Sequence, residues 1–116
     1  MRSFGVALAG IAYLIRTQRN FRLHLLAAAA AVALGLAVGL SAIEWALVSL
    51  TIALVVMMEG LNTGIELAVT LASPERRPEA RAAKDIAAGM VLIAAIASFA
   101  VGLLVFGPHV GALVRP

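Results

Sequence analysis

Acidic and amide side chains occur at helical spacing directly after a long, mostly apolar run. Glu59, Asn62 and Glu66 stand at positions i, i+3 and i+7. An α-helix turns once every 3.6 residues, so these positions lie on one helix face. Residues 46–58, which precede them, are mostly apolar and predict a membrane-spanning helix. A carboxylate close to the hydrocarbon is costly and marks a functional site by default, so we place the chemistry of this chain on this face.

Lys84 and Asp85 add a cation and a carboxylate to the candidate set. Magnesium prefers carboxylate and phosphate oxygens, and a carboxylate near the lipid surface can accept a proton from an alcohol. Phosphoryl transfer needs mainly positioning and neutralisation of charge. These residue types therefore predict the handling of phosphate with a divalent cation. No glycine-rich loop of the Walker type accompanies them in the sequence.

The composition is that of an integral membrane protein. Hydrophobic residues make up 63% of the 116 residues and charged residues only 13%, whereas soluble domains are about half apolar and about a quarter charged. The absence of cysteine excludes disulfides and thiol sites. His24 and His109 are too far apart in sequence to predict a His/Cys metal cluster, and we interpret His24 as a packing or interface residue. The length predicts one domain, residues 1–116.

The apolar runs predict an all-α membrane protein. Its three transmembrane helices are expected at about residues 23–40, 45–71 and 85–106. Residues 3–18 have amphipathic spacing and predict a helix that lies at the membrane interface, with an extension of the first span as the alternative. The polar stretch 72–83 predicts a loop, and Gly107 with Pro108 predicts the end of the last span.

The basic residues predict the orientation in the membrane. Four of the nine Lys and Arg residues lie in the first 22 residues, and four more lie in residues 76–84. Three spans place both regions on one side, which the positive-inside rule makes cytoplasmic. The N-terminus is then cytoplasmic and the C-terminus outside, with Glu59 near the inner boundary and Glu66 at the water side. Three helices cannot easily hide these polar groups, which favours an oligomer.

Three stretches agree in order and spacing with one known family: residues 19–25 (RNFRLHL), 59–66 (EGLNTGIE) and 83–89 (AKDIAAG). They resemble the small prokaryotic diacylglycerol kinases, in particular the undecaprenol kinase branch. The resemblance implies an ATP- and Mg²⁺-dependent kinase of a membrane lipid alcohol, undecaprenol or diacylglycerol. It implies action at the cytoplasmic face of the bacterial inner membrane and a homotrimer with active sites between subunits. No nucleic-acid partner is expected.

The resemblance also implies a role for single residues. Glu59 matches the base that accepts the proton of the lipid hydroxyl, and Glu66 matches a magnesium ligand. The positions implied at the ATP site are Asn62, Lys84, Asp85, Gln18 and Arg22, with Gln18 also at the metal. Asn62 could instead join helices within the membrane, as amides commonly do. Arg22 could instead be a cationic anchor at the membrane surface.

Two residues depart from the family pattern. Gln18 stands where the family usually has a metal-binding glutamate, and Thr70 stands where it usually has an aspartate. An amide oxygen can bind a metal but brings no charge. An alternative is therefore a weakened or non-catalytic membrane protein of the same fold that binds nucleotide or lipid. A proton or ion pathway through Glu59 and Glu66 is a third hypothesis, disfavoured because one cluster on one side makes no through-path.

Overall fold

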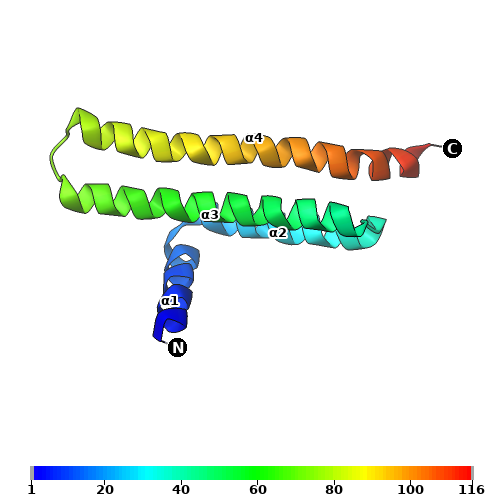
Figure 1. The fold of residues 1–116 in the computed structure, drawn as a ribbon, viewed down its shortest axis with the longest axis horizontal. Helices are drawn as coiled ribbons and strands as arrows, with labels where there is room; N and C mark the ends of the chain where they lie inside the picture. Colours follow the sequence, from blue (N-terminus) through cyan, green and yellow to red (C-terminus); the bar gives the residue numbers. More distant parts are fainter. Residues whose placement is uncertain (1, 116) are drawn as a thin grey trace.

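The computed structural model describes residues 2–115; Met1 and Pro116 lie outside the described residues. Its helices are α1 (Arg2–Thr17), α2 (Arg19–Val38), α3 (Ala42–Ala72) and α4 (Pro78–Val114). The three long helices run side by side, whereas α1 projects from the side of this bundle (Figure 1). The prediction of an all-α protein is confirmed for residues 2–115, and the helix expected at about residues 3–18 is α1.

A tight turn reverses the chain between α2 and α3. Gly39 ends α2 with a φ of 74°, and its N–H donates to the carbonyl of Gly35. Glycine suits this left-handed position because it has no Cβ to clash. Ser41 then begins α3 with a capping box: its hydroxyl accepts the N–H of Glu44 at 3.2 Å, and its own N–H donates to Glu44 Oε1 at 2.9 Å. Each bond satisfies a backbone or side-chain group that the helix end would leave unpaired.

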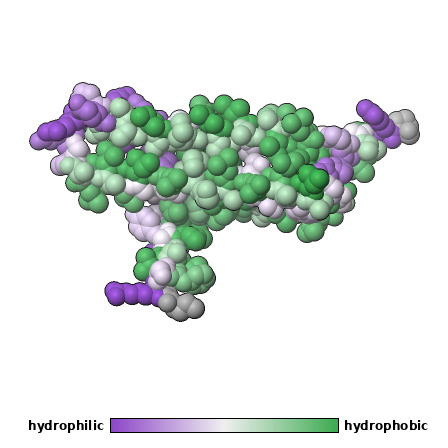
Figure 2. All heavy atoms as spheres, viewed as in Figure 1, coloured by the Kyte–Doolittle hydropathy of each residue, from purple (hydrophilic) through white to green (hydrophobic). Residues whose placement is uncertain are grey.

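Within residues 2–115, the helices long and apolar enough to cross a membrane are α2, α3 and α4. The 31 residues of α3 span about 46 Å, and the 37 residues of α4 span about 55 Å. Both exceed the hydrocarbon thickness of about 30 Å. The excess forms a hairpin that extends beyond the start of α2 (Figure 1). Figure 2 shows hydrophilic residues at this hairpin end and hydrophobic residues over the middle of the bundle.

The last helix is longer at both ends than the sequence predicted. The connection covers only residues 73–77 because α4 begins at Pro78. Proline suits the first turn of a helix, where its missing N–H would be unpaired in any case. The prediction that Gly107 and Pro108 end the span is wrong, because α4 continues to Val114. The contact of His109 Nε2 with Glu44 Oε2 at 3.0 Å holds α4 against α3 one residue beyond the proline.

The buried core of one chain is thin. Leu40, Val48 and Val105 form its apolar cluster near the α2–α3 turn. Many large apolar side chains face outward; Leu36, Leu50 and Phe99, for example, are 70% to 72% exposed. Such a surface suits lipid or neighbouring chains rather than water, because contiguous apolar patches of this kind are rare on soluble monomers.

Candidate functional site

Glu59 is a nearly buried carboxylate in the middle of a membrane-spanning helix. It lies on α3 and is 7% exposed. Its Oε1 atom lies 2.9 Å from Nε2 of His24 on α2. Burial of a carboxylate is costly unless a partner compensates the lost hydration, and the imidazole is such a partner. The contact joins two of the three spanning helices through a polar pair.

This pairing was missed by the sequence analysis, which interpreted His24 as a packing or interface residue. The signal that could have found it is that His24 ends the polar part of the stretch 19–25, one of the three that carry the family resemblance. Thr63, one turn beyond Glu59 and equally buried, uses its hydroxyl within α3: its Oγ1 donates to the Glu59 carbonyl at 3.2 Å. The neighbour that engages the Glu59 carboxylate is therefore His24.

The side chain of Asn62 has an unsatisfied hydrogen-bond acceptor in the described part of the chain. The residue is half-buried, and its Oδ1 is a buried atom with no hydrogen-bond partner among residues 2–115. A buried carbonyl oxygen without a donor costs free energy, so native proteins rarely leave one unsatisfied. A bound ligand or a second chain could supply the donor. Both predictions for Asn62, contact with nucleotide and adhesion between helices, are compatible with this atom.

Gln18 and Arg22 lie at the junction between α1 and α2 and make hydrogen bonds there. Gln18 has an extended backbone (φ −114°, ψ 109°), and its side-chain amide donates to Thr17 Oγ1 at 3.2 Å. Arg22 Nη1 donates to the carbonyls of Ile15 at 2.8 Å and Arg16 at 3.3 Å. Carbonyls in the last turn of a helix lack intrahelical partners, so this arginine caps α1. A guanidinium has five N–H donors, and contact of Arg22 with nucleotide stays a prediction.

The two helices α1 and α3 meet at a glycine beside Glu59. A Cβ built on Gly60 would lie only 3.3 Å from Leu14 Cδ1. A groove next to this contact is lined by residues of α1 and by Gly60, Thr63, Gly64 and Leu67 of α3. Helix α1 therefore covers the side of α3 that carries Gly60, Thr63, Gly64 and Leu67, which is adjacent to the face of Glu59, Asn62 and Glu66.

Glu66, Lys84 and Asp85 lie toward the hairpin end of α3 and α4. Glu66 and Lys84 each stand six residues from the loop-side end of their helix, and the two helices are antiparallel neighbours. Glu66 and Asp85 are exposed, whereas Lys84 is half-buried. Asp85 Oδ2 lies 3.9 Å from Arg81 Nε, a long and exposed pair that contributes little to stability. Among residues 2–115, no ion pair joins Glu66 to Lys84.

Binding of Mg²⁺ stays a prediction, with Glu66 and Gln18 as the candidate residues. Within residues 2–115, no group of three or more His, Cys, Asp or Glu side chains could hold a metal. Magnesium commonly needs only one or two carboxylates together with substrate phosphates. The exposed carboxylate of Glu66 meets this requirement, with the amide of Gln18 as an uncharged candidate ligand.

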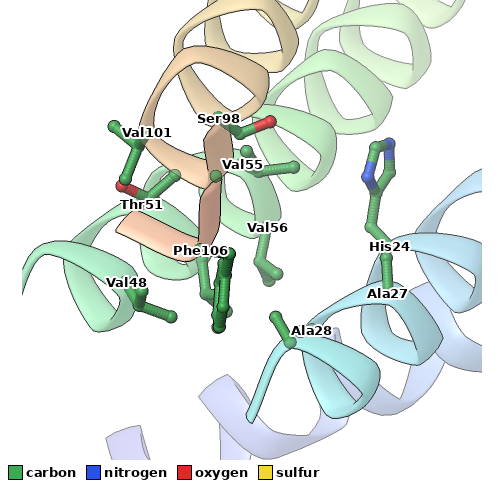
Figure 3. A pocket seen from close by; sticks show the side chains of 13 residues that line it. His24, Ala27, Ala28, Val48, Thr51, Val55, Val56, Ser98, Val101 and Phe106 are labelled. Atoms are coloured by element: carbon green, nitrogen blue, oxygen red, sulfur yellow. The ribbon is translucent and has the colours of Figure 1, made fainter. Parts of the chain in front are cut away.

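An apolar cavity of about 180 Å³ lies between α2, α3 and α4. His24 lies at its α2 side, while Val56 of α3 and Phe106 of α4 border the same space (Figure 3). Ala28 and Gly102 leave room there because their side chains are small or absent. An apolar cavity of about 150 Å³ accepts a molecule such as benzene, so this one holds a few carbon units.

Comparison with known proteins identifies the family. The family model for prokaryotic diacylglycerol kinases matches residues 5–106. The undecaprenol kinase of Bacillus subtilis (strain 168) is 45% identical over 107 residues, which is 92% of this chain and 87% of that protein. A diacylglycerol kinase of Synechocystis sp. is 45% identical over 101 residues, or 86% of this chain and 58% of that protein. The chain therefore belongs to the prokaryotic diacylglycerol kinase family, and it is a lipid kinase of the bacterial membrane.

Proposed function

We propose that this kinase transfers the γ-phosphate of ATP, with Mg²⁺, to the hydroxyl of undecaprenol or diacylglycerol at the cytoplasmic membrane face. The observation that carries the proposal is the Glu59 carboxylate. It is 7% exposed, lies on a membrane-spanning helix and contacts His24, which borders an apolar cavity. A base in this position can meet a hydroxyl whose carbon chain remains in the lipid.

In the proposed reaction, Glu59 accepts the proton of the lipid hydroxyl. The hydroxyl oxygen forms a bond to the γ-phosphorus, the bond between that phosphorus and the oxygen bridging to the β-phosphate breaks, and ADP leaves. Bound Mg²⁺ would neutralise negative charge on the phosphates. Glu66 would hold the ion, and Lys84 would lie near phosphate with Asp85 toward the adenosine.

Three further residues complete the proposed nucleotide site. Asn62 offers a buried oxygen that lacks a donor, and an amino or hydroxyl group of the nucleotide could supply one. Gln18 and Arg22 make hydrogen bonds at the junction of α1 and α2, and α1 contacts α3 at Gly60, next to Glu59. The side chains of Gln18 and Arg22 would reach the nucleotide from the α1 side.

Undecaprenol is the acceptor that we favour. The relative named undecaprenol kinase is matched over 87% of its length, against 58% for the relative named diacylglycerol kinase. The cavity beside His24 is bordered mainly by alanine, valine and phenylalanine, which suits a hydrocarbon chain.

The membrane arrangement and the assembly are parts of the same proposal. The N-terminus would be cytoplasmic with α1 at the membrane interface, and the C-terminus would lie outside. A homotrimer with active sites between subunits would cover apolar surface such as Leu50 and Phe99. It could also provide a donor for Asn62 from a neighbouring subunit.

A second candidate is a kinase with weak metal binding. Gln18 and the exposed Thr70 both lack the charge that the family pattern has at these positions. The shared test is phosphate transfer from labelled ATP in detergent micelles, with each lipid alcohol tested in parallel and Mg²⁺ present or chelated. Transfer that requires Mg²⁺ and is lost in Glu59→Gln is expected. Phosphate transfer by Gln18→Glu but not by the wild type would favour the second candidate. No phosphate transfer by any folded form would overturn both candidate functions.

A further inference from the structure

We propose that His24 is the positioning residue for Glu59: its Nε2–H holds Oε1 of the carboxylate and keeps the base oriented toward the lipid hydroxyl. The inference rests on the proposed role of Glu59 as the base and adds a residue to the machinery. The two side chains come from different helices, α2 and α3, and their contact is 2.9 Å. This distance is typical of a hydrogen bond assisted by charge.

The chemistry of the two groups assigns the direction of the bond. A carboxylate that is to act as a base must be ionised, and an ionised carboxylate only accepts hydrogen bonds. The proton in the contact is therefore on Nε2 of His24. An imidazole Nε2–H fills only part of what a carboxylate can accept, because two oxygens offer about four lone-pair positions. Glu59 keeps acceptor capacity for the hydroxyl of the substrate.

The need for such a partner follows from the place of Glu59 in the helix. At 7% exposure the carboxylate has little contact with solvent, and an isolated charge there would be driven to neutralise. The glutamate side chain also has three rotatable bonds, and an unrestrained base loses the orientation that makes proton transfer fast. One hydrogen bond from His24 both compensates the buried charge of Glu59 and restrains the orientation of its side chain.

His24 also faces the place where a lipid chain fits. The residue lines the apolar cavity between α2, α3 and α4, and Figure 3 shows its ring on the α2 side of that space. Its side chain is 30% exposed and that of Glu59 is 8% exposed. His24 therefore borders the cavity and also contacts the carboxylate, so it can hold the base close to an incoming hydroxyl.

The chain provides a matched control for this pair. His109 and Glu44 form a second imidazole–carboxylate contact, with Nε2 3.0 Å from Oε2 and both side chains 27% exposed. This pair joins α4 to the first turn of α3, at the end of the bundle far from the hairpin (Figure 1). Its chemistry resembles that of the His24–Glu59 pair, but it is remote from the proposed site.

The experiment measures kcat and KM for the lipid alcohol and for ATP in full-length protein in micelles with Mg²⁺. His24→Leu removes the donor and should lower kcat about 10- to 100-fold, the range expected for a misplaced reacting group, with the KM for ATP unchanged. His24→Gln keeps an N–H at a similar reach and should recover most of kcat. His24→Asn, one methylene shorter, should not. His109→Leu should keep the wild-type kcat.

A wild-type kcat in His24→Leu, with Glu59→Gln inactive, would overturn this inference and leave the proposed function standing. An inactive wild type with either lipid would overturn both. ATP binding serves as the check that each variant is folded. If His24→Leu fails this check, the test is the comparison of His24→Gln with His24→Asn. Equal kcat values for these two variants would refute the positioning role.

Discussion

Leu14 of α1 packs directly on Gly60 of α3, one residue beyond the buried Glu59. The Leu14 Cδ1 atom lies 3.3 Å from where a Cβ on Gly60 would stand. This contact, together with the bonds from Arg22 to the end of α1, sets the place at which α1 leaves the bundle. The missing side chain at residue 60 therefore determines how closely α1 approaches α3 next to Glu59.

Gly60→Val should displace α1 and lower the rate of phosphate transfer. The added methyl groups would enter the space that Leu14 occupies, and overpacking of this kind forces neighbours to move. The chain has no cysteine, so spin labels at Ser3→Cys and Thr70→Cys can report the distance between α1 and α3. Gly107→Val is the control, because Gly107 lies on α4 outside the groove between α1 and α3 and a Cβ there meets no atom within 4 Å. An unchanged label distance in Gly60→Val would contradict the prediction.

Filling the apolar cavity should weaken binding of the lipid and leave ATP binding unaltered. Gly102 borders the cavity, and a Cβ there meets no atom within 4 Å, so Gly102→Leu places its side chain in the open space. We expect KM for the lipid alcohol to rise about tenfold, the low end of the discrimination that one or more methylenes produce in an apolar pocket. Gly107→Leu, on the same helix outside the cavity, should behave as wild type. Equal changes in the KM values for lipid and ATP would count against the cavity as the binding site for the hydrocarbon chain of the lipid.

The magnesium requirement should respond to charge at two positions. Gln18→Glu adds a carboxylate at the candidate metal site, so half-maximal activity should need about tenfold less Mg²⁺, since ligand charge tunes affinity for such cations. Glu66→Gln should shift the requirement in the opposite direction or abolish transfer. The measurement is activity against Mg²⁺ concentration at constant ATP. Glu75→Gln serves as control, because Glu75 is an exposed carboxylate of the connection 73–77 with a side chain 80% exposed. A wild-type Mg²⁺ curve for Glu66→Gln would exclude Glu66 as a ligand.

Loss of Glu44 should lower thermal stability more than loss of His109. Glu44 accepts the Ser41 N–H in the capping box and also contacts His109, so Glu44→Ala removes two interactions. His109→Leu removes one and leaves the cap intact. Thermal unfolding in detergent should rank wild type above His109→Leu and His109→Leu above Glu44→Ala, with kcat per folded molecule unchanged in each. A Glu44→Ala variant that is more stable than His109→Leu would mean that the capping box contributes nothing measurable to thermal stability.

Much of the fold could be predicted from sequence because hydropathy and helical spacing are local properties. The apolar runs predicted the α-helical class and the positions of α2 and α3 to within a few residues. The end of α4 could not be predicted in this way. Gly107 and Pro108 are local stop signals, but the contact between His109 and Glu44 lies beyond them and depends on how far α3 reaches.

The same division holds at the candidate site. Helical spacing along residues 59–66 was enough to place Glu59, Asn62 and Glu66 on one helix face, and these residues together with 19–25 and 83–89 identified the family. The pairing of His24 with Glu59 and the packing of Leu14 on Gly60 became visible in the folded chain alone. Periodicity describes one helix at a time, whereas contacts between helices depend on their relative offset and rotation, because side chains from several segments determine these together.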